Sequence, residues 1–129
     1  VTLICGGLGG VMEAAASGAK DAGGVTVGIL PRADAEDANP YVDLPIVTDL
    51  GNARNVINVL TSQAIIAIQG GSGTLSEIAL ALKCGTPVVG LESWTLTPPE
   101  GGAPPEIEIV RTPEEAVAAA LRLIRTRRK

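Results

Sequence analysis

The sequence predicts an α/β fold in which helices cover both faces of a doubly wound, mostly parallel sheet. Short apolar runs alternate with stretches of helical character along the 129 residues. Glycine-rich segments at 6–10 and 70–73 each follow an apolar run and precede a helical stretch. This alternation is typical of a three-layer parallel sheet, whose ligands bind beyond the carboxyl ends of the strands. The length fits a single domain over residues 1–129.

In the first half of the chain, glycine and proline separate the apolar runs from the helical ones. The run at 1–5 ends at the first glycine cluster, and Pro31 ends the run at 25–30. The small residues between these runs favour a helix that ends at Gly23 and Gly24. The predicted segments are strands at 1–5, 25–30 and 46–48, helices at 11–22 and 52–62, and a polar loop at 32–45.

The clearest helix of the second half begins near Thr74. Apolar residues follow at the i, i+3, i+4 and i+7 spacing of one helix face. Thr74 and Glu77 form the T-x-x-E pattern of a capping box, Gly85 ends the helix, and Thr112 is the expected N-cap of a last helix. The predicted segments are strands at 64–68, 87–91 and 107–110, helices at 74–84 and 113–125, and a proline- and glycine-rich loop at 94–105.

The amino-acid composition excludes several classes of chemistry. The chain has no histidine, which removes Ser-His-Asp triads, Cys-His pairs, histidine-ligated zinc and imidazole proton shuttles. Cys5 and Cys84 lack CxxC spacing, so we expect free buried thiols in a reducing cytoplasm. We predict no metal site and no required cofactor. We also predict no membrane partner, since no apolar run is long enough for a membrane span and no signal peptide is visible.

Charge is distributed unevenly along the chain. All 14 carboxylates lie in residues 1–121, whereas five of the last eight residues are basic. The acidic body argues against a nucleic-acid partner. The basic end is typical of the last turn of a helix, where cations interact favourably with the helix dipole.

Two glycine loops are the main candidates for a binding site. Glycine allows backbone N–H groups to approach a ligand closely, and the start of the following helix adds partial positive charge. The two loops therefore predict a site for two anionic parts of one phosphorylated ligand, although tight strand–helix turns alone also explain the glycines. Neither loop matches the dinucleotide fingerprint or the phosphate loop of nucleotide hydrolases. The candidate residues are Gly6, Gly7, Gly9 and Gly10 in the first loop, and Gly70, Gly71, Ser72, Gly73 and Thr74 in the second.

Three charged residues near helix starts are further candidates. Arg54 lies in the first turn of the predicted helix 52–62, where a cation opposes the helix dipole. A guanidinium there is suited to bind a phosphate bidentately, and the alternative is an ion pair with Asp49 or another nearby acid. Glu13 and Glu77 stand near the starts of other helices, where the helix dipole or a capping box alone accounts for a carboxylate.

Four motifs in this order resemble the superfamily of molybdenum-cofactor carrier proteins, LOG-type cytokinin-nucleotide phosphoribohydrolases and proteins mislabelled as lysine decarboxylases. The resemblance covers about residues 1–92 and implies a Rossmann-like fold, a nucleotide- or phosphate-bearing ligand and a homo-oligomer, usually a dimer. The motifs are Gly6-Gly-Leu-Gly-Gly-Val-Met-Glu-Ala14, Gly28-Ile-Leu-Pro31, Gly70-Gly-Ser-Gly-Thr-Leu-Ser-Glu77-Ile78 and Gly85-Thr-Pro-Val-Val-Gly90.

The hydrolase branch of this superfamily has a P-G-G-x-G-T-x-x-E motif and an upstream arginine. The second loop with Glu77 matches that motif, and Arg54 matches the arginine, so the resemblance makes Arg54 and Glu77 catalytic if the protein is a hydrolase. Gln69, however, stands in place of the proline, and Asn55 replaces the lysine that normally follows the arginine. The pair Arg54-Asn55 and the segment Met12-Glu13-Ala14 are more similar to the carrier-type branch, which adds Met12, Glu13 and Asn55 to the predicted ligand site.

The leading hypothesis is therefore a carrier-like binding protein for a phosphorylated pterin- or nucleotide-like ligand, such as molybdenum cofactor or a nucleotide. The runner-up is a hydrolase that cleaves the N-glycosidic bond of a nucleoside 5′-monophosphate, and a structural or regulatory oligomer is the third. The chain begins at what resembles the second strand of the family, so we expect a domain that is shortened at its N-terminus.

Overall fold

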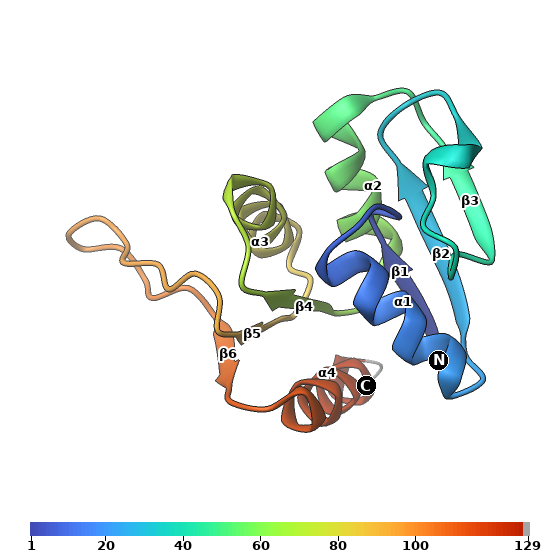
Figure 1. Cartoon of the computed structure of the whole chain (residues 1–129). Coiled ribbons are helices and arrows are strands. Elements are labelled where there is room, and N and C mark those ends of the chain that lie inside the picture. The colour runs from blue at the N-terminus through green and yellow to red at the C-terminus, as the bar shows by residue number, and fades with distance from the viewer. Residues whose placement is uncertain (128–129) are drawn as a thin grey trace. The chain divides into compact units, whose positions relative to one another are not determined.

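The computed structural model describes residues 1–127, and its elements follow the predicted order of strands and helices (Figure 1). The chain divides into two compact units, Val1–Asn58 and Val59–Lys129, which are described separately below. Each unit contains a parallel sheet of three strands. The predicted α/β class with parallel strands is thus confirmed.

The first unit is built on a sheet in the order β1-β2-β3. Helix α1 packs against β1 and β2 of this sheet, and the side chains of Ala16, Ile29 and Leu30 are fully buried. Parallel pairing aligns Cys5 with Gly28, so the chain leaves β1 for the first glycine loop while β2 continues alongside. The elements are β1 (Thr2–Cys5), α1 (Val11–Asp21), β2 (Val25–Leu30), the 3-10 helix η1 (Ala35–Asp37) and β3 (Leu44–Val47).

The predicted helix 52–62 has two parts. A 3-10 helix, η2 (Gly51–Arg54), precedes α2 (Asn55–Thr61), and the boundary between the two units falls within α2. Asp49 and Gly51 both have positive φ angles, so the chain turns sharply between the end of β3 and the 3-10 helix. As a result Arg54 ends a tight turn instead of standing in the first turn of an α-helix.

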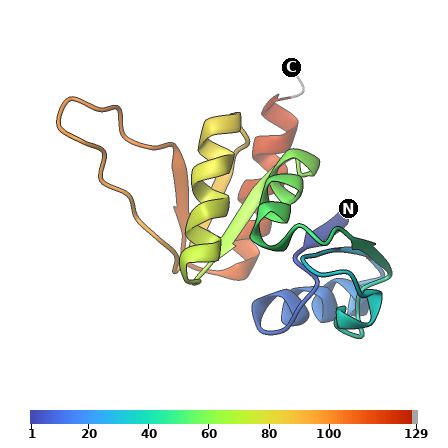
Figure 2. The same ribbon diagram turned by 90° about the horizontal axis from the view of Figure 1, so that it is seen from above.

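The second unit has helices on both faces of its sheet, which has the order β4-β5-β6 (Figure 2). Helix α3 packs on one face through Ile78 and Ala81, and α4 packs on the other through Ala116 and Ala119. This arrangement confirms the predicted three layers within this unit. The elements are β4 (Ile65–Ile68), α3 (Ser72–Cys84), β5 (Val88–Leu91), β6 (Ile107–Val110) and α4 (Pro113–Arg127).

The predicted capping box at the start of α3 is wrong. The helix begins at Ser72, so Thr74 is its third residue, and the N-cap Gly71 makes no side-chain capping hydrogen bond. Two other helix ends were predicted correctly. Gly85 ends α3 with a φ of 70°, and the hydroxyl of Thr112 accepts a hydrogen bond from the Glu115 amide at the start of α4.

Two further predictions concern the cysteines and the basic end. Within the described chain neither cysteine is part of a disulfide, as expected, but Cys84 is exposed and Cys5 is half-buried, so their predicted full burial is wrong. Of the basic residues at the end, Arg125 and Arg127 lie in the last turn of α4, whereas residues 128–129 lie outside the described part of the chain. Among residues 1–127, no helix has the length and apolar character that a membrane span requires.

The replacement Gly18→Ala is expected to stabilise the first unit. Gly18 is exposed inside α1, and a Cβ built there meets nothing within 4 Å. Alanine restricts the unfolded chain and favours the helix, so we expect the free energy of unfolding to rise by about 0.5–1 kcal/mol in urea titrations. Gly85→Ala is the matched contrast. It should lower the free energy of unfolding, because Gly85 has a φ of 70°, a left-handed conformation that is unfavourable for alanine.

Candidate functional site

The first glycine loop, Gly6–Gly10, lies directly on strand β2. Gly7 has a φ of +79°, and a Cβ built on it would stand 2.5 Å from Cδ2 of Leu30. A Cβ on Gly28 would stand 3.0 Å from the Cα of Gly7. Both glycines are therefore required for the close approach of this loop to the carboxyl-terminal half of β2.

Arg54 is buried beside this loop, with 7% of its surface exposed. Its Nε donates a hydrogen bond of 2.9 Å to the carbonyl oxygen of Ile29 in β2, and its Nη1 donates to Oδ1 of Asn55. Asn55 is itself only 3% exposed. Two edges of the guanidinium are thus fixed by neutral acceptors of the same unit.

The Nη2 edge of Arg54 faces the glycine loop. A Cβ built on Gly6 would lie 2.8 Å from Nη2 of Arg54 and 2.6 Å from Sδ of Met12. Within the first unit, no carboxylate forms an ion pair with Arg54, so the predicted alternative of a pair with Asp49 is wrong. The structure therefore brings the predicted residues Gly6, Met12, Arg54 and Asn55 together.

The other predicted residues of the first loop lie at its open side. Cβ atoms built on Gly9 and Gly10 meet nothing within 4 Å. Glu13 is in the first turn of α1, where its carboxylate complements the helix dipole. Gly10 is the N-cap of α1 with a φ of 68°, so its backbone conformation alone accounts for a glycine there.

Asn39 is a residue of this site that the sequence did not reveal. It lies in the loop after β2 with 8% of its surface exposed, and its Nδ2 donates to the carbonyl oxygens of Leu8 (2.9 Å) and Gly7 (3.3 Å). Its own amide donates to the Gly7 carbonyl at 2.8 Å, and its Oδ1 accepts from the amide of Tyr41 at 3.0 Å. The predicted polar loop thus holds the backbone of the glycine loop.

The loop that carries Asn39 is anchored at its far end by Asp43. The carboxylate of Asp43 accepts hydrogen bonds from Lys20 Nζ at 2.8 Å and from the Thr26 amide at 3.0 Å. The hydrogen bond from Lys20 is the main cause that holds the pKa of Asp43 below its usual value, and the bond from the Thr26 amide adds to it. Asn39 therefore stands in a segment that is tied to both α1 and β2.

The second glycine loop, Gly70–Gly73, belongs to the other unit and has a strained entry. Gln69 and Gly70 have φ angles of 46° and 99°. A Cβ on Gly70 would stand 2.1 Å from Oγ1 of Thr74, so only glycine fits there. The amides of residues 70–74 have no acceptor among the described residues, as expected at a helix start, and Glu77 is half-buried one turn further along α3.

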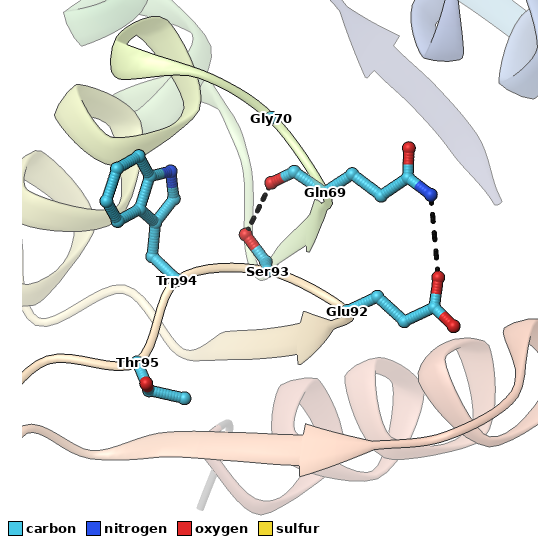
Figure 3. A pocket seen from close by; sticks show the side chains of 6 residues that line it. All are labelled: Gln69, Gly70, Glu92, Ser93, Trp94 and Thr95. Atoms are coloured by element: carbon cyan, nitrogen blue, oxygen red, sulfur yellow. Dashed lines mark hydrogen bonds between the residues drawn. The ribbon is translucent and has the colours of Figure 1, made fainter.

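A cavity of about 310 Å³ lies at the carboxyl ends of β4 and β5 (Figure 3). Ser93 Oγ donates to the carbonyl oxygen of Gln69 at 2.7 Å, and Trp94 Nε1 donates to that of Gly71 at 3.1 Å. The side chain of Gln69 also donates a hydrogen bond of 3.5 Å, from Nε2 to the carboxylate of Glu92. The sequence predicted a proline- and glycine-rich loop at 94–105 and gave no sign of this cavity. The lining residues are Gln69, Gly70, Glu92, Ser93, Trp94 and Thr95.

The described residues offer no candidate metal centre. Within residues 1–127, no group of three or more histidine, cysteine, aspartate or glutamate side chains is arranged to hold a metal ion. The donors that the first unit gathers at its glycine loop are backbone amides and the guanidinium of Arg54. This donor set suits an oxyanion such as a phosphate.

The fold is shared with solved structures of known binding proteins. The molybdenum cofactor binding protein of the phototrophic bacterium Rippkaea orientalis matches with a TM-score of 0.83 and 43% identity, over 95% of this chain and 77% of that one. The molybdenum cofactor carrier protein of Chlamydomonas reinhardtii matches with a TM-score of 0.79 and 38% identity, over 96% and 78%. These likenesses confirm the predicted Rossmann-like class.

Sequence comparisons agree with the structural ones. An uncharacterized protein of Archaeoglobus fulgidus is 52% identical over 115 residues, which are 89% of this chain and 71% of the relative. The model of the SLOG cluster4 family matches residues 1–117. The chain therefore belongs to the SLOG cluster4 family, and its structural relatives include the molybdenum cofactor carrier proteins.

Proposed function

We propose that the protein binds a phosphorylated pterin- or nucleotide-like ligand in the manner of a molybdenum cofactor carrier, with Arg54 on the phosphate. The observation that carries this proposal is the burial of the Arg54 guanidinium without a carboxylate partner in the first unit. Buried charges in proteins are normally paired, because removal of a charge from water costs several kcal/mol. An anionic ligand at the Nη2 edge would supply the missing charge.

The glycine loops support the same function through their backbone. In the first unit, the amides of Leu8 and Gly9 have no acceptor among the described residues, and Gly6 leaves room for Arg54 beside them. In the second unit, the amides at the start of α3 are also available to an anion. We propose that each loop binds through these amides, with Gly7 and Gly70 required for the loop conformations.

The relatives favour molybdenum cofactor among phosphorylated ligands. The structures from Rippkaea orientalis and Chlamydomonas reinhardtii are named as a binding protein and a carrier protein for this cofactor, and both are more than a third identical to this chain. Molybdenum cofactor joins a pterin to a phosphate, so its phosphate fits the Arg54 site. We therefore propose it as the first ligand to test, with nucleoside monophosphates as the second.

The replacement Arg54→Gln is expected to weaken binding of the phosphorylated ligand. Loss of a charge-assisted hydrogen bond costs about 1.5–3 kcal/mol, so we expect the Kd to rise about tenfold or more. Titration calorimetry with molybdenum cofactor and a panel of nucleoside monophosphates measures this change.

Two controls separate a binding role of Arg54 from a folding role. Arg32→Gln removes an exposed arginine that pairs with Asp37, and this variant should bind like the wild type. A nucleoside without phosphate should bind the wild type and the Arg54→Gln variant equally. Equal affinity of both proteins for the phosphorylated ligand would contradict the proposal.

A nucleoside monophosphate phosphoribohydrolase is the second candidate function. Thr74 and Glu77 lie on the same helix, three residues apart, next to a loop whose glycines match the hydrolase motif. Glu77 would then stabilise positive charge that develops on the ribose. Against this, Gln69 replaces the proline of that motif and has a φ of 46°, which a proline ring cannot adopt. The loop backbone therefore differs from one that begins with proline.

We expect no release of ribose 5-phosphate above background from a panel of nucleoside 5′-monophosphates. The strained Gln69 gives this loop an entry that is unlike the hydrolase motif, so Glu77→Ala should leave the background rate unchanged. A colorimetric assay for the reducing sugar measures the release. Turnover that disappears in Glu77→Ala would replace the carrier proposal with the hydrolase.

A further inference from the structure

The backbone of the first glycine loop is held from one side by Asn39. Its side-chain amide donates to the carbonyl oxygens of Gly7 and Leu8, and its main-chain amide donates to that of Gly7. These contacts join residues that are more than 30 positions apart in the sequence. Asn39 is 8% exposed, so its hydrogen bonds are largely shielded from water.

Peptide geometry turns these contacts into a constraint on the loop amides. A peptide unit is planar and trans, so its N–H points away from its carbonyl oxygen. With the carbonyl groups of Gly7 and Leu8 directed at Asn39, the N–H groups of Leu8 and Gly9 are directed away from it. Neither N–H has an acceptor among the described residues.

We infer that Asn39 is a positioning residue, which aims the amides of Leu8 and Gly9 at the phosphate of the bound ligand. This inference rests on the proposed function and adds to it a residue that does not itself touch the ligand. A carboxamide suits the role because it donates twice through Nδ2 while Oδ1 still accepts from Tyr41. Aspartate lacks those donors and would bring negative charge to an anion site.

The second unit repeats this arrangement with different side chains. Ser93 Oγ and Trp94 Nε1 donate to the carbonyl groups of Gln69 and Gly71, as Figure 3 shows for the first of these bonds. By the same geometry, the N–H groups of Gly70 and Ser72 are directed away from Ser93 and Trp94. Both donors directly follow β5, as the loop of Asn39 follows β2. In each unit, therefore, the glycine loop is oriented by the segment that follows a neighbouring strand, β2 in the first unit and β5 in the second.

The test is a titration of the protein with inorganic phosphate, followed by amide signals in nitrogen–proton NMR spectra. In the wild type we expect the Leu8 and Gly9 signals to shift with phosphate. Asn39→Ala should raise the Kd about tenfold and reduce these shifts, because the amides are no longer held in one direction. Asn52→Ala is the matched control, since Asn52 is exposed and its side chain makes no hydrogen bond among the described residues.

A second variant covers the case in which Asn39→Ala does not fold. Asn39→Ser retains a hydroxyl that accepts from the amide two residues on, and so keeps the local turn, but it cannot donate to both carbonyl groups. It should fold and weaken phosphate binding to a similar extent. If Asn39→Ser binds phosphate with wild-type affinity while Arg54→Gln binds it more weakly, the inference on Asn39 is wrong and the proposed function stands. Absence of any phosphate-induced shift in the wild type overturns the proposed function as well.

Discussion

The guanidinium of Arg54 is the group around which the first unit arranges its candidate site. It is 7% exposed, and its two fixed edges donate to the Ile29 carbonyl and to Asn55, both of which are neutral. Neutral acceptors satisfy hydrogen bonds but do not balance the charge, so burial leaves the protein with electrostatic energy that a bound anion would lower. Ligand binding to this site should therefore also stabilise the folded chain.

The glycines make this burial sterically feasible. Gly6 leaves the space into which Nη2 of Arg54 and Sδ of Met12 extend, and Gly7 with Gly28 lets the loop lie on β2. Side chains at these positions would lift the loop from the strand or displace the arginine. The high glycine content is thus partly explained by close contacts between backbone and side chains, and not only by the conformational freedom of turns.

The order of strands and helices was predictable because it depends on local patterns. Apolar runs located all the strands of the described residues, although β3 begins at Leu44 and not at the predicted residue 46, and Thr112 and Gly85 marked their helix ends correctly. The start of α3 was predicted two residues late, because the positive φ angles of Gln69 and Gly70 are set by the surrounding fold and not by a sequence signal.

The candidate site was predictable only in part, since long-range contacts leave no periodic signal. Arg54 and the glycines were identified by their residue type, whereas no sequence signal indicated that Asn55 is buried against Arg54. Asn39 and Trp94 were missed, because each acts through contacts with residues 23 to 32 positions away. A single polar residue in a polar loop is not distinguished by sequence from its neighbours.

A crystal structure of the protein grown with phosphate tests the central claim most directly. We predict a phosphate beside Gly6, with oxygens within hydrogen-bonding distance of Arg54 Nη2 and of the Leu8 or Gly9 amide. A carboxylate of the protein paired with Arg54, and no anion beside Gly6, would contradict the claim.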